Sequence, residues 1–224
     1  MRTNVYVDGF NLYYGCFQNK HHPQDKCYKW LDLAEFLRRA LPHDHINKIR
    51  YFTAIVSGSA HDPNKPLRQR TYIRALQTIP NLTVHEGHFL TTRKTGRLVN
   101  ARGVATPKLQ EVEVREEKGS DVNLATHLLM DAVDKDFELA VIVSNDSDLI
   151  WPIEVVRKKF GRQVGVLNPQ SGFSGAIYKT ATFYKKIPRA ELANCQFLDP
   201  MTDASGTFNR PISWAPPPSV PTST

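Results

Sequence analysis

Apolar runs alternate along the chain with segments of helical periodicity. Six runs have strand character, at residues 3–7, 49–56, 82–90, 111–116, 139–144 and 163–167. Four segments predict helices, at residues 30–41, 66–79, 120–134 and 148–160. Strands separated by helices of this length predict crossover connections and therefore a parallel pairing of strands. The fold class that we predict is α/β, a three-layer α/β/α domain with a mainly parallel central sheet.

The composition changes near the C-terminus. Residues 200–224 are rich in Pro, Ser and Thr and show no apolar periodicity, which predicts a disordered tail. The chain of 224 residues is long enough to bury one core and short enough to favour a single domain. We therefore predict one folded domain over residues 1–190, followed by the tail.

The N-terminus and the cysteines bear on the cellular compartment. No apolar run approaches the roughly 20 residues that a membrane span needs, and Asp8 interrupts the first run before a signal-peptide core could form. Cys16, Cys27 and Cys195 are scattered and odd in number, which indicates reduced thiols and not a disulfide framework. We expect a cytoplasmic protein without a membrane segment.

Positive charge is in excess and unevenly distributed. The formal net charge is +7 and the isoelectric point is near 9.3, which favours a polyanionic partner, nucleic acid above all. Residues 91–108 contain no acid and five basic residues, Arg93, Lys94, Arg97, Arg102 and Lys108. Two interpretations remain open for this stretch: a mobile arm that contacts phosphates, or a solvated loop.

Carboxylates follow the predicted strands where those strands end. Asp8 follows the first strand, Asp146 and Asp148 follow the strand at 139–144, and Asp121 opens the third helix. The carboxyl ends of parallel strands meet at one rim of the sheet, where ligands of such folds bind. Clustered carboxylates repel one another unless a cation offsets their charge, and Mg²⁺ or Mn²⁺ prefers oxygen ligands.

Each of these acids also has a purely structural interpretation. Asp121 and Asp148 would be stabilised by helix dipoles, and Asp146 would serve as an N-cap. Asp8 would make a turn with Asn11 nearby as a cap. Four acids at one predicted rim nevertheless exceed what capping requires, which favours a functional site.

Other common chemistries lack sequence support. The chain contains neither G-x-G-x-x-G nor G-x-x-x-x-G-K-[ST], the motifs of dinucleotide and P-loop phosphate sites. It also lacks the G-x-S-x-G motif of acyl transfer. A site without an obvious side-chain nucleophile is compatible with water activated by a metal ion.

Three motifs in order resemble those of the NYN domain nucleases, within the PIN-like ribonuclease superfamily. They are YVDGFNLYY, EEKGSDVNLATHLL and VIVSNDSDL, and the resemblance covers roughly residues 3–187. It implies a PIN-like, Rossmann-like fold with an acidic metal-binding pocket. It also implies metal-dependent hydrolysis of phosphodiester bonds, usually in RNA.

The resemblance assigns roles residue by residue. Asp8, Asp121 and Asp146 would be the main ligands of Mg²⁺ or Mn²⁺, and Asp148 would complete the acidic cluster. Asn11 and Ser144 would orient ligands, water or the scissile phosphate, which makes these six the expected catalytic set.

Basic side chains would hold the nucleic acid without reading its sequence. The expected binding residues are Arg93, Lys94, Arg97, Arg102 and Lys118. Lys118 has an equally good alternative, which is an ion pair with Glu116, Glu117 or Asp121.

The leading hypothesis is a Mg²⁺- or Mn²⁺-dependent ribonuclease, with endonucleolytic cleavage of RNA as the expected reaction and DNA as a possible substrate. Two alternatives come from other classes. One is an RNA-binding regulatory or adaptor module that keeps the pocket but does not cut. The other is a small-molecule phosphohydrolase on the same fold.

Overall fold

The strand β1 (Arg2–Asp8) lies at the centre of the sheet because its residues are buried on both faces from Thr3 onward. The computed structural model describes residues 1–18 and 23–216. Six strands pair in the order β3-β2-β1-β6-β7-β8, and every pair is parallel. The other strands of this sheet are β2 (His45–Thr53), β3 (Leu82–Glu86), β6 (Leu139–Val143), β7 (Gln163–Asn168) and β8 (Phe183–Lys186).

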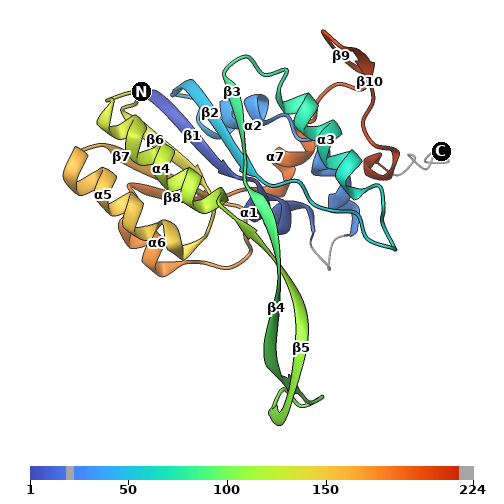
Figure 1. Cartoon of the computed structure of the whole chain (residues 1–224). Coiled ribbons are helices and arrows are strands. Elements are labelled where there is room, and N and C mark those ends of the chain that lie inside the picture. The colour runs from blue at the N-terminus through green and yellow to red at the C-terminus, as the bar shows by residue number, and fades with distance from the viewer. Residues whose placement is uncertain (19–22, 217–224) are drawn as a thin grey trace, which may run out of the picture.

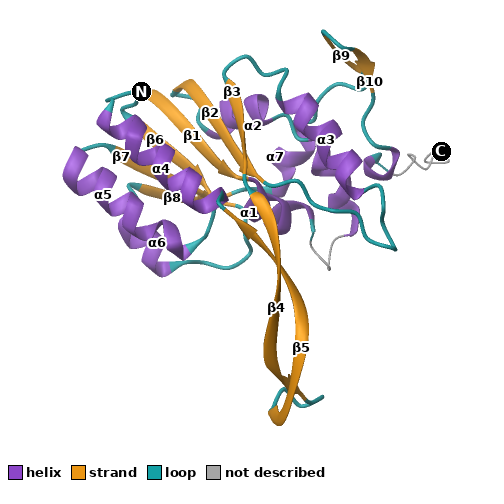
Figure 2. Cartoon of the chain, in the orientation of Figure 1, coloured by secondary structure: helices purple, strands orange, loops and turns teal. Residues whose placement is uncertain are grey.

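Helices cover both faces of the sheet, as Figure 2 shows. On one face, α2 (Leu33–Ala40), α3 (Lys65–Leu76) and α7 (Arg189–Asn194) share a core cluster with Val5 and Val7 of β1. On the other face, α4 (Ser120–Val133), α5 (Ile150–Phe160) and α6 (Gly175–Thr180) share a second cluster with Tyr6. Alternate residues of β1 therefore serve opposite layers, and the predicted α/β/α architecture is confirmed.

Shorter helical turns complete these layers. They are α1 (Gly9–Leu12), a π-helix η1 (Tyr13–Phe17), and the 3₁₀ helices η2 (Pro23–Trp30) and η3 (Ser147–Leu149). In the described ranges, no helix has the length and apolar character needed to cross a membrane.

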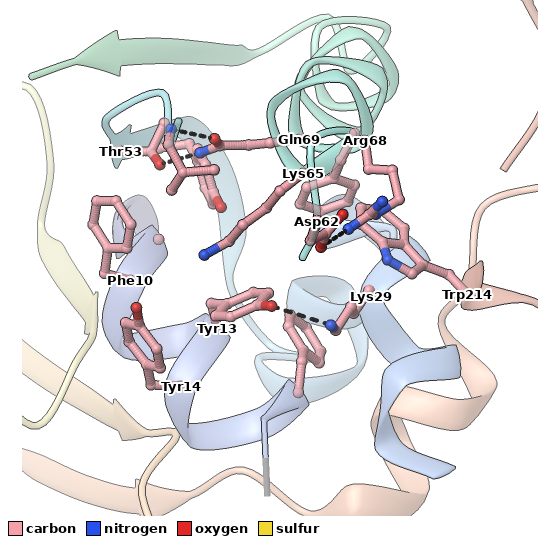
Figure 3. A pocket seen from close by; sticks show the side chains of 15 residues that line it. Phe10, Tyr13, Tyr14, Lys29, Thr53, Asp62, Lys65, Arg68, Gln69 and Trp214 are labelled. Carbon is pink, nitrogen blue, oxygen red and sulfur yellow. Dashed lines mark hydrogen bonds and ion pairs between the residues drawn. The ribbon is translucent and has the colours of Figure 1, made fainter. Parts of the chain in front are cut away.

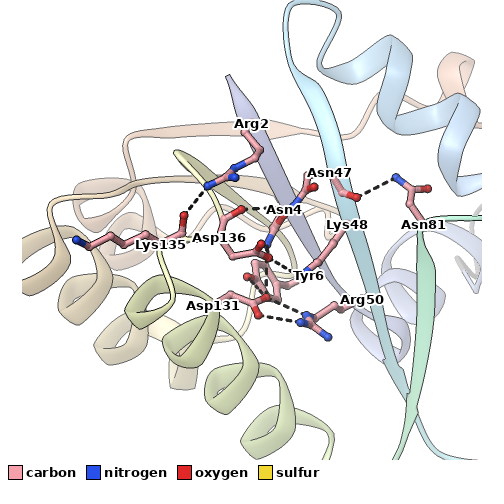
Figure 4. Close-up of polar contacts among 10 residues, drawn as sticks. All are labelled: Arg2, Asn4, Tyr6, Asn47, Lys48, Arg50, Asn81, Asp131, Lys135 and Asp136. Atoms are coloured by element: carbon pink, nitrogen blue, oxygen red, sulfur yellow. Dashed lines mark hydrogen bonds and ion pairs between the residues drawn. The ribbon is translucent and has the colours of Figure 1, made fainter.

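A buried polar network fixes α4 against the sheet (Figure 4). The Arg50 guanidinium donates two hydrogen bonds to the Asp131 carboxylate, at 2.9 and 2.8 Å. The Tyr6 hydroxyl donates a third at 2.7 Å, and Asn4 donates to Asp136 at 2.9 Å. The Asp131 side chain is 7% exposed and that of Arg50 is 15% exposed, so this ion pair is largely shielded from water.

Residues 88–118 form a two-stranded antiparallel ribbon that projects from the body (Figure 1). Its strands are β4 (His88–Val99) and β5 (Ala105–Lys118). The prediction that 111–116 is a strand of the central sheet was therefore wrong, and most of 91–108 is paired strand where a loop or an arm was expected. The physical reason is that EVEVREE alternates glutamate with valine, whereas a strand buried in a parallel sheet is apolar on both faces.

The C-terminal segment is ordered as far as the structure describes it. It forms β9 (Met201–Asp203), β10 (Gly206–Phe208) and the 3₁₀ helix η4 (Ile212–Trp214). Phe208 and Trp214 are buried, with ring centroids 6.3 Å from those of Trp30 and Tyr72 respectively. The predicted disorder was thus wrong up to residue 216, because two aromatic anchors outweigh the polar composition around them. Residues 217–224 of the predicted tail lie outside the described residues.

Candidate active site

The predicted acids lie at the point where the order of the strands reverses. From β1 the sheet extends through β2 to β3 on one side, and from β6 to β8 on the other. Ligands of open α/β sheets bind at such a switch point, outside the carboxyl ends of the strands. Val7 pairs with Val143, so Asp8 and Ser144 follow directly at neighbouring strand ends.

Asp8 is held by hydrogen bonds to both of its carboxylate oxygens. The backbone N–H of Asn11 donates to Oδ1 at 2.9 Å, which makes Asp8 the N-cap of α1. Ser144 Oγ donates to Oδ2 at 2.9 Å and accepts from the backbone N–H of Asp146 at 3.1 Å. Asp8 itself is therefore the cap, whereas the structural interpretation gave Asp8 a turn and made Asn11 the cap, and the same side chain also joins the ends of β1 and β6.

Asn11 connects three loops at this rim. Its Oδ1 accepts from the backbone N–H of Asn145 and from Nε2 of Gln170, both at 3.1 Å. Tyr184 donates to the Asn145 side chain at 2.8 Å. Gln170 follows β7 and was not predicted, although its place after a third parallel strand is a signal that the strand-end rule could have used.

One open pocket brings most of the predicted residues together. Asp8, Asn11, Asp121 and Asp146 line it, with Phe10, Tyr14, Phe89, Glu117 and Gln170 as the further lining residues. Asp121 reaches it from the first turn of α4, and Asp146 from the N-cap of η3. Ser144 is buried behind this lining, and its hydroxyl supports Asp8 from there.

Asp148 occupies a different position from the other acids. It is exposed, does not line the pocket, and donates its backbone N–H to Asp146 Oδ1 at 3.0 Å. Its negative charge still helps to raise the pKa of Asp121. Asp148 therefore acts at the edge of the site through its charge and its backbone.

Burial and mutual repulsion disfavour the charged forms of these acids. Burial raises the pKa of Asp8 to about 6. The hydrogen bonds from Asn11 and Ser144 lower this pKa, whereas the charges of Asp121 and Asp146 raise it further. Burial also raises the pKa of Asp121, and the charges of Asp146 and Glu117 raise it further. The pocket thus concentrates negative charge where water solvates it poorly.

The donor set suits a hard cation, because all of its candidate ligands are carboxylate oxygens. Asp8, Asp121 and Asp146 are the residues placed to contribute them. Across residues 1–18 and 23–216, however, no three His, Cys, Asp or Glu side chains are already arranged as a metal-binding group. Binding of Mg²⁺ or Mn²⁺ stays a prediction.

Glu117 was not predicted as a site residue, because in the sequence it belongs to a run of charged residues with no distinguishing pattern. Its Oε1 accepts from the backbone N–H of Ser120 at 3.0 Å and from Ser120 Oγ at 2.8 Å, so it caps the start of α4. Phe89, at the base of β4, packs edge-on against Phe10 with ring centroids 5.8 Å apart. The ribbon therefore begins at the wall of the acidic pocket.

The ribbon separates the predicted nucleic-acid-binding residues into two groups. Lys94 and Lys118 both pair with Glu116, the latter at 3.1 Å, which was the alternative left open for Lys118. Arg93 lies opposite Glu113 in the register of the ribbon. Arg97 and Arg102, toward the far end, form no ion pair within the described part of the chain. The basic stretch is therefore partly neutralised by acids that β5 places beside it.

Comparisons with known proteins agree with this architecture. The family model of the NYN domain matches residues 2–185. The chain is 30% identical, over 96% of its length, to the 6-hydroxy-3-succinoylpyridine 3-monooxygenase HspA of Pseudomonas putida (strain DSM 28022 / S16), of which it covers 75%. A crystal structure of a protein of unknown function from Vibrio parahaemolyticus RIMD 2210633 is similar in fold, with a TM-score of 0.50 and 16% identity. That likeness covers 84% of this chain and 93% of the other. The resemblance to NYN domains inferred from three motifs is confirmed.

The raised pKa of Asp8 predicts that this carboxylate lowers the stability of the fold at neutral pH. The folded state holds the Asp8 proton more tightly than the unfolded state does, so stability falls as the pH rises from about 4 to about 6. Asp8→Asn should therefore increase the free energy of unfolding at pH 7.5 by on the order of 1–3 kcal/mol, and the gain should shrink towards zero near pH 4.

Urea unfolding of the two proteins across this pH range measures the effect. Asp134→Asn, which changes an exposed acid at the end of α4, is the matched control and should leave stability within about 0.5 kcal/mol. An Asp8→Asn protein that is no more stable than the original at pH 7.5 would contradict the prediction. If the pocket binds Mn²⁺, the ion should raise the melting temperature of the original chain more than that of the variant.

Proposed function

Because the chain belongs to the NYN domain family, we propose that it is a divalent-metal-dependent ribonuclease that cuts RNA within the strand. The observation that carries this proposal is the pocket lined by Asp8, Asp121 and Asp146 at the switch point of the sheet. Burial and neighbouring acids raise the pKa of Asp8 and of Asp121, and such shifted carboxylates are a common mark of a functional site.

In this proposal the three pocket acids hold Mg²⁺ or Mn²⁺. The bound ion would lower the pKa of a water molecule and offset the charge of the scissile phosphate. Ser144 and Asn11 keep Asp8 and the surrounding loops in place through the hydrogen bonds described above. Asp148 adds negative charge from the edge of the pocket, without lining it.

The ribbon supplies a path for the phosphate backbone. Its base lines the acidic pocket, and residues 96–108 near its tip contain Arg97, Arg102 and Lys108 but no acid. A strand of RNA that lies along the ribbon would reach the pocket at the ribbon's base. Such contacts to phosphates position a nucleic acid without reading its sequence.

Asp146→Asn should abolish metal-dependent cleavage of RNA, with a loss of about 100-fold or more if the carboxylate is a metal ligand. Asparagine keeps the oxygen that accepts from the N–H of Asp148, so the turn should persist. Asp148→Asn is the matched control and should reduce the rate by about 10-fold or less, because Asp148 does not line the pocket.

Cleavage of a fluorescent RNA with Mg²⁺ or Mn²⁺, with and without EDTA, measures both effects. Equal cleavage by Asp146→Asn and the original chain would contradict the proposal. RNA binding without turnover in any metal would favour the adaptor alternative. Turnover of phosphomonoesters alone would favour the phosphohydrolase.

The tip of the ribbon should contribute more to RNA binding than its ion-paired base. Arg97→Gln with Arg102→Gln should weaken binding roughly 10-fold and make the slope of log affinity against log salt shallower by about 1.5. Lys94→Gln with Glu116→Gln removes both ion pairs of Glu116, with Lys94 and with Lys118, without changing the net charge, so affinity should change little. Filter binding to single-stranded RNA at several salt concentrations tests both pairs, and equal losses would contradict the assignment.

A second candidate function follows from the similarity to HspA, which extends over nearly the whole chain. In that case this protein would be a monooxygenase acting on a hydroxypyridine. The test supplies 6-hydroxy-3-succinoylpyridine as the substrate and NADH as the two-electron reductant, and measures oxygen uptake and aromatic products. The ribonuclease proposal expects no turnover here. Substrate-dependent oxygen uptake by a protein that leaves RNA intact would replace it with the second function.

A further inference from the structure

A second cavity lies beside the acidic pocket and is separate from the predicted site. It has a volume of about 150 Å³ and shares only Phe10 and Tyr14 with the lining of the acidic pocket (Figure 3). Its walls come from α1, η1, η2, β2, α3 and the C-terminal η4. None of the residues predicted from the sequence to be catalytic or to bind nucleic acid lines it.

Aromatic rings form a rigid wall of this cavity. Tyr51, Tyr72 and Trp214 are each less than 9% exposed. Tyr72 packs edge-on against both of the others, with ring centroids 6.4 Å from Tyr51 and 6.3 Å from Trp214. Such rings offer faces and edges to a further planar ring without losing much conformational freedom.

The polar groups of the cavity carry an excess of positive charge. Lys29, Lys65 and Arg68 line it, against a single acid, Asp62, which pairs with Arg68. Lys29 donates to the Tyr13 hydroxyl at 3.1 Å. Burial lowers the pKa of Lys29, and the positive charge of Arg68 lowers it further. The positive charges of the cavity are therefore incompletely offset by Asp62.

Lys65 is the cation best placed to meet a ligand. Figure 3 shows its side chain reaching from α3 into the cavity, toward Tyr13. Its amine makes no hydrogen bond or ion pair among the residues that the structure describes. The hydroxyl of Tyr51, another lining residue, is likewise without a hydrogen-bond partner in this part of the chain. Burial raises the pKa of Tyr51, so this hydroxyl keeps its proton and can donate a hydrogen bond to an anion.

Gly9 preserves the position of this hydroxyl. A Cβ at residue 9 would lie 2.7 Å from the Tyr51 oxygen and 2.7 Å from the backbone oxygen of Phe52. A larger residue would therefore displace the ring that lines the cavity. The sequence DGFN thus serves the acidic pocket through Asp8 and the aromatic cavity through Gly9.

From the aromatic wall, the unpaired amine and the small volume, we propose that this cavity binds a single-ring aromatic acid. The ring would lie against Tyr72 and Trp214, with its carboxylate toward Lys65 and the Tyr51 hydroxyl. A cavity of about 150 Å³ is the size of one that holds benzene in an engineered protein, so one ring fits inside it. The inference rests on the cavity alone and not on the ribonuclease proposal, and the succinoylpyridine in the name of HspA belongs to the same class of ligand.

Calorimetric titration of the full chain with four probes tests the proposal. Benzoate carries the ring and the charge, benzamide lacks the charge, cyclohexanecarboxylate lacks the aromatic ring, and uridine monophosphate is the nucleotide. Benzoate should bind at least 10-fold more tightly than each of the other three. Uridine monophosphate as the tightest of the four would overturn the proposal and assign the cavity to nucleic acid.

Two variants and one control locate the binding. Lys65→Met should weaken benzoate binding at least 10-fold and remove the preference over benzamide, whereas Lys179→Met, an exposed lysine on α6, should change neither. Tyr51→Phe removes only the hydroxyl and should weaken benzoate about 3-fold. The far-ultraviolet circular dichroism and the melting temperature of each variant establish that it is folded. Unchanged discrimination between benzoate and benzamide in folded Lys65→Met would refute the assignment.

Discussion

The parallel pairing of β1 with β6 is the constraint on which the acidic site depends. Val7 lies beside Val143, and the chain leaves the sheet directly after this pair. Asp8 and Ser144 are thereby brought within 2.9 Å although 136 residues separate them in the sequence. A slip of one residue in either strand would turn one of these side chains to the opposite face and dismantle the contact.

The third acid depends on a different interaction. Asp121 lies on α4, and α4 is fixed to β1 and β2 about three turns further along by the bonds from Arg50 and Tyr6 to Asp131. Removing one partner from a shielded ion pair leaves the other charge without compensation, which is why such pairs tolerate little change. The position of Asp121 is therefore determined from a point well away from the pocket that it lines.

The sequence predicted the parts of the molecule that local pattern controls. Continuous apolar runs indicated β1, β6 and β7, and the acids after them indicated the rim, because strand ends in a parallel sheet share a direction. The ribbon was missed because its pairing depends on contacts across two strands and not on an apolar face. The C-terminal segment was missed because Phe208 and Trp214 act through long-range packing that composition does not encode. The aromatic cavity joins Lys29, Tyr51, Lys65 and Trp214, which no motif connects.

The ribbon and α4 share a joint. Gly119, between β5 and α4, has a φ of +100°, and a Cβ there would lie 3.8 Å from the Cα of Gly87, which lies between β3 and β4. Beyond this joint β5 extends for 14 residues, or about 45 Å. Glu117 and Asp121 flank this glycine, and both line the acidic pocket. The direction in which the ribbon leaves the body and the placement of one wall of the pocket are therefore set at the same joint.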